Sequence, residues 1–212
     1  MRRATLFVVL LAAPAWAQSS ADDHLLAGAQ YFRDEHYREA LVEFRVAERT
    51  GSDGGASWYV ASALVKLKRP EEAITVFARA EASAATDRDA LLDYYHALAC
   101  YDAKLYGCAD RLLAGIGSQA GPRIATQARK IRDDLAPVMS ATPSTGTIDW
   151  YHANGASAVK AGHRELAIGY YDEALRLSGL RPDTYRRKEA SAALSRLQAS
   201  KRAADTTSEK GP

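Results

Sequence analysis

Few side chains in this sequence combine the types and the spacing that catalysis, metal binding or disulfide formation requires. Two cysteines, Cys100 and Cys108, stand eight positions apart. In an exported chain, such a pair predicts a disulfide. The sequence contains no nucleophile motif of a serine hydrolase, no His-Glu-x-x-His zinc motif and no glycine-rich phosphate loop. We therefore expect a protein without enzymatic activity, cofactor or bound metal.

The five histidines are scattered along the chain rather than clustered. Only His24 follows two acids, Asp22 and Asp23, and this group is compatible with metal binding. A solvent-exposed helix start, in which the acids favour the helix dipole, is the simpler interpretation. An enzyme would need an acid or nucleophile that the fold assembles from distant positions, so catalysis ranks third among the hypotheses.

Whether the two cysteines bond depends on the backbone between them. On one continuous helix their Cα atoms would be about 12 Å apart, too far for a bond. A turn at residues 104–107 would bring them into range, and the bond would then contribute at most about 2.6 kcal/mol. The alternative is two unpaired, buried thiols. A redox-active pair is disfavoured, because the spacing is not Cys-x-x-Cys.

The N-terminus has the pattern of an export signal. Arg2 and Arg3 precede an apolar run, Ala4–Ala13, and Ala15-Trp16-Ala17 is a small-x-small cleavage pattern. The apolar run is shorter than the about 20 residues that span a bilayer. We expect a signal peptide over residues 1–17, a mature chain without a transmembrane segment, and a location in the bacterial periplasm, with secretion as the alternative.

The remaining composition is that of an ordinary globular chain. Of the 212 residues, 47% are hydrophobic and 25% are charged, which excludes collagen-like and disordered classes. Removal of residues 1–17 takes away two arginines and no acid, so 26 basic and 26 acidic side chains remain. A neutral mature chain does not attract phosphate backbones, and we expect no nucleic-acid partner.

Helical spacing dominates the sequence, and no run of alternating β-branched residues predicts a strand. Residues 38–48 and 71–81 align at an offset of 33 residues, with Glu, Ala, Phe, Ala and Glu at matching places. A repeat of this length indicates stacked structural units. We interpret both segments as the second helix of a helical hairpin.

The first unit carries Gly28, Tyr31, Tyr37, Ala40 and Phe44 in the order small, large, large, small, large. The small residues would let two antiparallel helices approach closely, while the large ones fill the space between hairpins. The pattern resembles the tetratricopeptide repeat. This resemblance implies an all-α fold of antiparallel helix hairpins that form a short right-handed superhelix with capping helices.

Four such units account for most of the mature chain. Three hairpins and a capping helix are expected over residues 18–136, followed by a linker over 137–147 that is rich in Pro, Ser, Thr and Gly. A fourth hairpin with its own capping helix is expected over 148–200, packed against the first three, and a disordered tail over 201–212.

In the tetratricopeptide family, the first helices of successive repeats line a concave groove that holds a peptide or a helix of a partner protein. Leu25, Trp58 and Tyr94 occupy equivalent places in three neighbouring units. The alternative for Trp58 and Tyr94 is an ordinary core position, since aromatic side chains at helical spacing are usually buried. The resemblance places the following residues in the groove: Leu25, Phe32, Arg33, Trp58, Ser62, Lys66, Tyr94, Leu98, Tyr101, His152 and Lys160.

A second candidate surface is basic and lies near the C-terminus. Acidic lipid headgroups, an anionic cell-wall polymer or an acidic partner would bind such a surface. The simpler interpretation is the solvated face of a capping helix. Its residues are Arg181, Arg186, Arg187, Lys188 and Arg196.

These observations favour a non-enzymatic scaffold that binds a segment of another cell-envelope protein in the repeat groove. The process served would be assembly of an outer-membrane, secretion, motility or cell-wall complex. The alternative is an accessory protein that binds the cell wall or anionic lipid through the basic C-terminal helix.

Overall fold

The computed structural model describes residues 16–51, 55–83, 89–117 and 120–208. These residues form helices and connecting loops, with no strand among them, which confirms the expected all-α class. The helices are α1 (Trp16–Arg33), α2 (Tyr37–Thr50), α3 (Gly55–Lys66), α4 (Pro70–Ser83), α5 (Ala90–Asp102), α6 (Tyr106–Gly115), α7 (Pro122–Ser140), α8 (Thr145–Lys160), α9 (Arg164–Gly179) and α10 (Arg187–Ser208).

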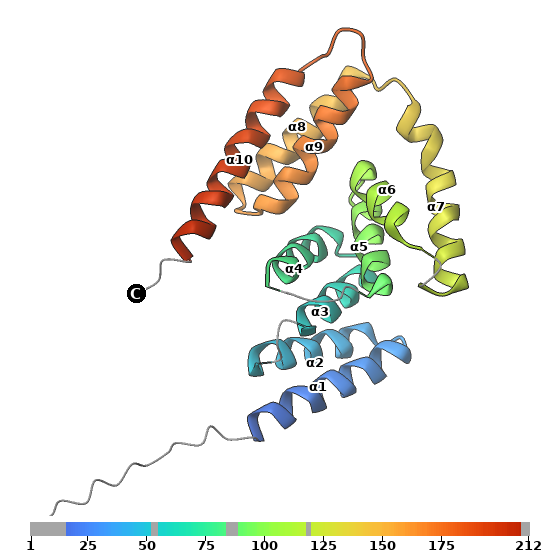
Figure 1. Cartoon of the computed structure of the whole chain (residues 1–212), viewed down its shortest axis with the longest axis vertical. Helices are drawn as coiled ribbons and strands as arrows, with labels where there is room; N and C mark the ends of the chain where they lie inside the picture. The colour runs from blue at the N-terminus through green and yellow to red at the C-terminus, as the bar shows by residue number, and fades with distance from the viewer. Residues whose placement is uncertain (1–15, 52–54, 84–88, 118–119, 209–212) are drawn as a thin grey trace, which may run out of the picture.

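Consecutive helices pack in pairs, and the pairs form two layers (Figure 1). The hairpins α1–α2, α3–α4 and α5–α6 stack in chain order, and α7 runs along α6 and the neighbouring part of α5. The hairpin α8–α9 with α10 forms the second layer. Its helix α9 packs against both α4 and α6.

The turns of the four hairpins have the same conformation. In each, a residue with positive φ follows the first helix: Glu35, Lys68, Lys104 and Gly162. The next residue donates its backbone N–H to a carbonyl five positions earlier at 2.8 to 3.0 Å: His36 to Tyr31, Arg69 to Leu64, Leu105 to Cys100, and His163 to Ala158. This is the hydrogen bond of a Schellman helix end. The third hairpin therefore has the same turn as the other three.

Small residues face large ones at the same register in the hairpins. A Cβ atom added at Gly28 would lie 2.6 Å from the Phe44 ring, and one added at Gly155 would lie 2.9 Å from the Tyr171 ring. The alanines that follow the turns are completely buried, as are nearly all of the large side chains one helical turn later. The alanines are Ala40, Ala73, Ala109 and Ala167, and the large residues are Phe44, Phe77, Leu113 and Tyr171.

Cys100 and Cys108 form a disulfide, as the pair predicted. The turn between α5 and α6 brings their Cα atoms to 5.9 Å, within the range of a disulfide. The bond joins the last turn of α5 to the first turn of α6, so it fixes the two helices of the third hairpin to each other.

The fourth hairpin is attached to the others by polar contacts at its inner face. The Tyr151 hydroxyl donates to the Lys104 carbonyl at 2.7 Å, at the turn of the third hairpin. The Tyr170 hydroxyl donates to Glu71 Oε1 at 3.1 Å, on α4. Arg111 on α6 pairs with Asp172 at 3.2 Å. Because α9 reaches both the second and the third hairpin, the last unit folds back over them.

Two helix boundaries differ from those that the sequence suggested. The proline-containing segment is mostly helical, because α7 continues through Pro137 to Ser140 and α8 begins at Thr145. Ser144 caps α8 by accepting the Thr147 N–H at 3.1 Å, so only a short connection separates the helices. Helix α10 extends to Ser208, eight residues into the predicted tail, in agreement with its alanine and lysine content.

The predicted signal peptide lies almost entirely outside the described residues, which begin at Trp16. Across the described part of the chain, no helix has the length and apolar character needed to cross a membrane.

Candidate interaction surface

Two of the residues that the sequence placed in the groove belong to the core. Trp58 is only 6% exposed, and its ring packs against Phe77 at 5.7 Å. Ser62 is also buried, and its hydroxyl donates to the Trp58 carbonyl. The physical reason is the position of α3, which packs against α2, α4 and α5 and so has little free surface. A substitution at Trp58 therefore perturbs folding and does not test partner binding.

The structure instead gathers side chains from the first helices of three successive hairpins, α1, α3 and α5, into one cluster with the first residue of α2. Phe32 lies perpendicular to Tyr95, with ring centroids 5.8 Å apart, and 5.3 Å from Tyr37. Lys66 Nζ lies 5.5 Å from the centroid of Tyr37 and 5.7 Å from that of Tyr95. Tyr94 adjoins Tyr95 at 6.2 Å. We call Phe32, Tyr37, Lys66, Tyr94 and Tyr95 the aromatic cluster.

The cluster continues along α5 and reaches α7. Tyr94, Leu98 and Tyr101 share one face of α5, since they are spaced by four and three residues. The Tyr94 hydroxyl donates to Gln127 Oε1 on α7 at 3.2 Å. Tyr101 is 39% exposed and contacts Tyr106. A strip of partly exposed aromatic surface thus extends from the first hairpin to the third.

The chemistry of this strip is that of a neutral, amphipathic surface with a basic edge. Burial raises the pKa of Tyr94 and Tyr95 above the ordinary value, so both keep their hydroxyl protons as hydrogen-bond donors. Exposed Arg33 follows Phe32 on α1, and the charge of exposed Arg123 on α7 acts on Tyr94. Aromatic rings with cationic neighbours are typical of binding hot spots.

The other predicted groove residues lie elsewhere or contribute at the edge. Leu25 is half-buried on α1 and packs against the core. His152 and Lys160 lie on α8, which packs mainly against α9, so the structure does not bring them to the aromatic cluster. His152 is buried and its ring contacts Tyr171 at 5.6 Å. Lys160 is exposed and lies beside Tyr171 and Arg196.

Burial of His152 predicts a pH dependence of stability. Burial, helped by the charge of Arg186, lowers its pKa below the ordinary 6.5. The unfolded chain therefore binds this proton more readily than the folded one, and the free energy of unfolding should fall as the pH drops below 6.5. Denaturant titrations between neutral and mildly acidic pH check this. The fall in the free energy of unfolding with decreasing pH should be smaller in His152→Gln. It should be unchanged in the exposed control His163→Gln.

The predicted basic surface is partly neutralised within the protein. Arg181 pairs with Asp183 at 2.7 Å and donates to the Pro143 carbonyl, while Arg186 pairs with Asp149 at 2.8 Å. These hydrogen bonds lower the pKa of Asp149 and of Asp183. Arg187, Lys188 and Arg196 are exposed on α10. The surface is therefore less strongly cationic than the sequence indicates.

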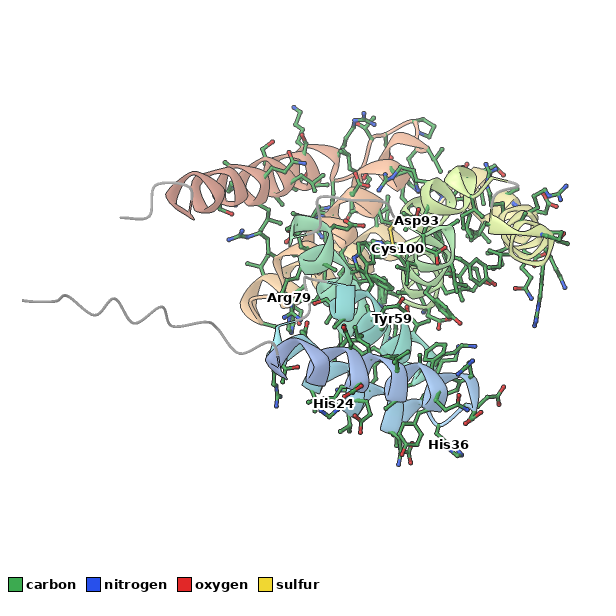
Figure 2. All side chains as sticks on the ribbon, turned by 60° about the horizontal axis from the view of Figure 1, so that its bottom comes forward. His24, His36, Tyr59, Arg79, Asp93 and Cys100 are labelled. Atoms are coloured by element: carbon green, nitrogen blue, oxygen red, sulfur yellow. A yellow bond between two sulfur atoms is a disulfide. The ribbon has the colours of Figure 1, made fainter. Side chains whose placement is uncertain are left out.

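His24 has a structural partner. Its Nδ1 lies 2.6 Å from Glu43 Oε2, which joins α1 to α2. His24 and His36 lie on the first hairpin at the edge of the molecule, far from Cys100 in the interior (Figure 2).

Sequence reasoning missed Tyr37, Tyr95 and Gln127 as members of the surface. Tyr37 was assigned to filling space between hairpins, but its ring also supports Lys66. A detectable signal existed for Tyr95, because it stands next to Tyr94, which the repeat register had placed in the groove.

Comparisons with protein-family models, with curated proteins and with solved structures give no match to this chain.

Proposed function

We propose that this protein is a non-enzymatic interaction scaffold of the bacterial periplasm. It binds a segment of another cell-envelope protein on the aromatic cluster and supports assembly of an envelope complex. The observation that carries the proposal is the convergence of Phe32, Lys66 and Tyr95 from three successive hairpins on one partly exposed surface. The predicted signal peptide and the resemblance of the hairpins to tetratricopeptide repeats support it.

The surface favours a segment with apolar side chains and at least one carboxylate. Aromatic contacts contribute about 0.5–1.5 kcal/mol each beyond the burial of area. Lys66, already held between two tyrosine rings, loses little freedom when a carboxylate approaches it. Because the hairpins are packed and one is also disulfide-linked, the surface is ordered before the partner binds.

Cross-linking in intact cells tests the proposal, with Lys66→Glu and Tyr94→Ala compared with the unaltered protein. We expect each substitution to reduce capture of one envelope protein at least tenfold, because charge reversal repels the carboxylate and truncation removes an aromatic contact. Lys160→Glu is the matched control, since Lys160 ends the first helix of the fourth hairpin as Lys66 ends that of the second. Equal capture by all variants would contradict the proposal.

A further inference from the structure

A cavity of about 380 Å³ lies between α4, α5, α6 and α9, and none of the residues of the aromatic cluster line it. Both cysteines and His96 line it, together with four carboxylate residues and one arginine. These charged residues are Glu81, Glu165, Asp172, Glu173 and Arg111. The rest of the lining is mostly apolar, and two of the acids already have a basic partner: Asp172 pairs with Arg111, and Glu173 pairs with Arg176.

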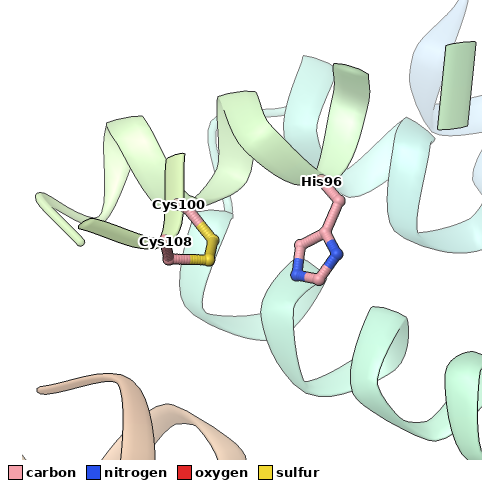
Figure 3. A group of neighbouring side chains, drawn as sticks. All are labelled: His96, Cys100 and Cys108. Carbon is pink, nitrogen blue, oxygen red and sulfur yellow. A yellow bond between two sulfur atoms is a disulfide. The ribbon is translucent and has the colours of Figure 1, made fainter. Parts of the chain in front are cut away.

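Three metal-ligating side chains meet at this cavity. His96 and Cys100 stand four residues apart on the same face of α5, and the turn brings Cys108 on α6 beside them. One nitrogen of His96 and the two sulfur atoms all lie within 4.8 Å of one another. Figure 3 shows the imidazole turned toward the sulfur atoms across one helical turn. Ligands of one tetrahedral zinc ion lie about 3.8 Å apart, so small side-chain rotations suffice to enclose a metal.

The histidine ring is oriented in the way that metal ligands usually are. His96 is 8% exposed and stacks on Phe77, with centroids 4.6 Å apart. Its Nδ1 lies 3.1 Å from Glu81 Oε1, at ion-pair distance although outside hydrogen-bond geometry. In metal sites, a carboxylate next to Nδ1 is the usual outer partner of a histidine whose Nε2 binds the metal. Glu81 thus supplies the outer partner of a carboxylate–histidine–metal arrangement.

We propose that reduction of the Cys100–Cys108 disulfide converts this cluster into a binding site for one Zn²⁺ ion. A dithiol supplies two electrons and two protons, becomes a disulfide itself, and leaves two thiols on the protein. Zinc then forms two bonds to sulfur while the two thiol protons pass to water, and His96 Nε2 donates its lone pair. Two thiolates and an imidazole select a borderline metal over calcium or magnesium. Water would complete the coordination of the ion as a fourth ligand.

The oxidised protein does not offer this site, because a disulfide sulfur is a poor metal ligand. The cluster therefore couples metal binding to the redox state of the compartment. This inference does not depend on the binding of a partner to the aromatic cluster.

Titration of the full-length protein with Co²⁺ tests the site, after reduction with a phosphine that contributes no thiol. We expect one Co²⁺ per chain, with thiolate-to-cobalt charge-transfer absorption, and displacement of Co²⁺ by Zn²⁺. The oxidised protein should show no such absorption. Far-UV circular dichroism recorded alongside should show helical protein. A reduced protein that lacks the charge-transfer band, or that loses its helices and does not regain them on adding metal, would overturn the proposal.

Two variants distinguish a specific loss of metal binding from a general loss of stability. His96→Gln should weaken Co²⁺ binding at least tenfold, because it removes a ligand at the cavity. Glu81→Gln keeps all three ligands and should weaken binding by about tenfold through loss of the orienting carboxylate. The exposed His163→Gln is the control and should bind as the unaltered protein does. Unchanged affinity in His96→Gln would contradict the assignment.

Discussion

Replacement of Glu173 by alanine is expected to lower the free energy of unfolding by about 3 kcal/mol. The side chain is 2% exposed and joins α9 to α6, because its Oε2 accepts the Gly107 N–H at 2.9 Å. Its Oε1 accepts from Arg176 Nε at 3.0 Å, and Arg176 also donates to the Met139 carbonyl on α7. Alanine would leave a guanidinium and a backbone N–H partly buried without this acceptor, which is the costly way to break a buried pair.

Denaturant unfolding of Glu173→Ala, followed by circular dichroism, measures this loss. Asp172→Ala is the matched control on the neighbouring residue. Asp172 pairs with Arg111 at the surface, and both side chains are substantially exposed, so its removal should cost at most about 1 kcal/mol. Equal effects of the two substitutions would show that the Glu173 contact does not hold the fourth hairpin in place.

Replacement of Gly28 by alanine is expected to destabilise the protein by about 1–3 kcal/mol, through overpacking. An added Cβ would lie 2.6 Å from two atoms of the Phe44 ring, and that ring is 1% exposed and has no room to move away. This change in the free energy of unfolding has the opposite sign to the usual one. At an open position within a helix, replacing glycine by alanine stabilises a protein by about 0.5–1 kcal/mol.

Thermal or denaturant unfolding of Gly28→Ala tests this expectation against Gly146→Ala. Gly146 lies in the first turn of α8, where an added Cβ meets only the Ser144 hydroxyl at 3.8 Å. The second variant should be neutral or slightly stabilising. In a Phe44→Leu background the penalty at position 28 should shrink, because the smaller side chain relieves the clash. A stabilising effect of Gly28→Ala in the unaltered protein would refute the packing of the first hairpin.

The hairpins could be predicted from the sequence because their determinants are local. The offset of 33 residues that aligns Ala40 with Ala73 and Phe44 with Phe77 reflects the contacts that each hairpin repeats. The disulfide could be anticipated because the turn between Cys100 and Cys108 is short. A local signal also exists for the zinc ligands, since His96 and Cys100 are four residues apart, but Cys108 joins them only through the turn between α5 and α6.

Trp58 was harder to place because the repeat register alone does not settle exposure. It occupies the same register as Leu25 and Tyr94, yet α3 lies between other helices and almost all of its side chains are buried. The unbroken apolar and small residues from Val60 to Val65 are the signal of such a helix. The docking of α9 was not predictable in detail, because the Glu173 carboxylate meets a backbone N–H 66 residues away in the chain.

A photo-cross-linking residue placed singly along the molecule tests the proposed scaffold function most directly. Position 101, on the exposed end of the aromatic strip, is compared with position 42 on α2 and position 159 on α8, which are at least as exposed in the structure. We expect one envelope protein to be captured in intact cells from position 101 and from position 66, and not from positions 42 and 159. Capture of that protein from 42 or 159 alone, with none from 66 or 101, would contradict the account.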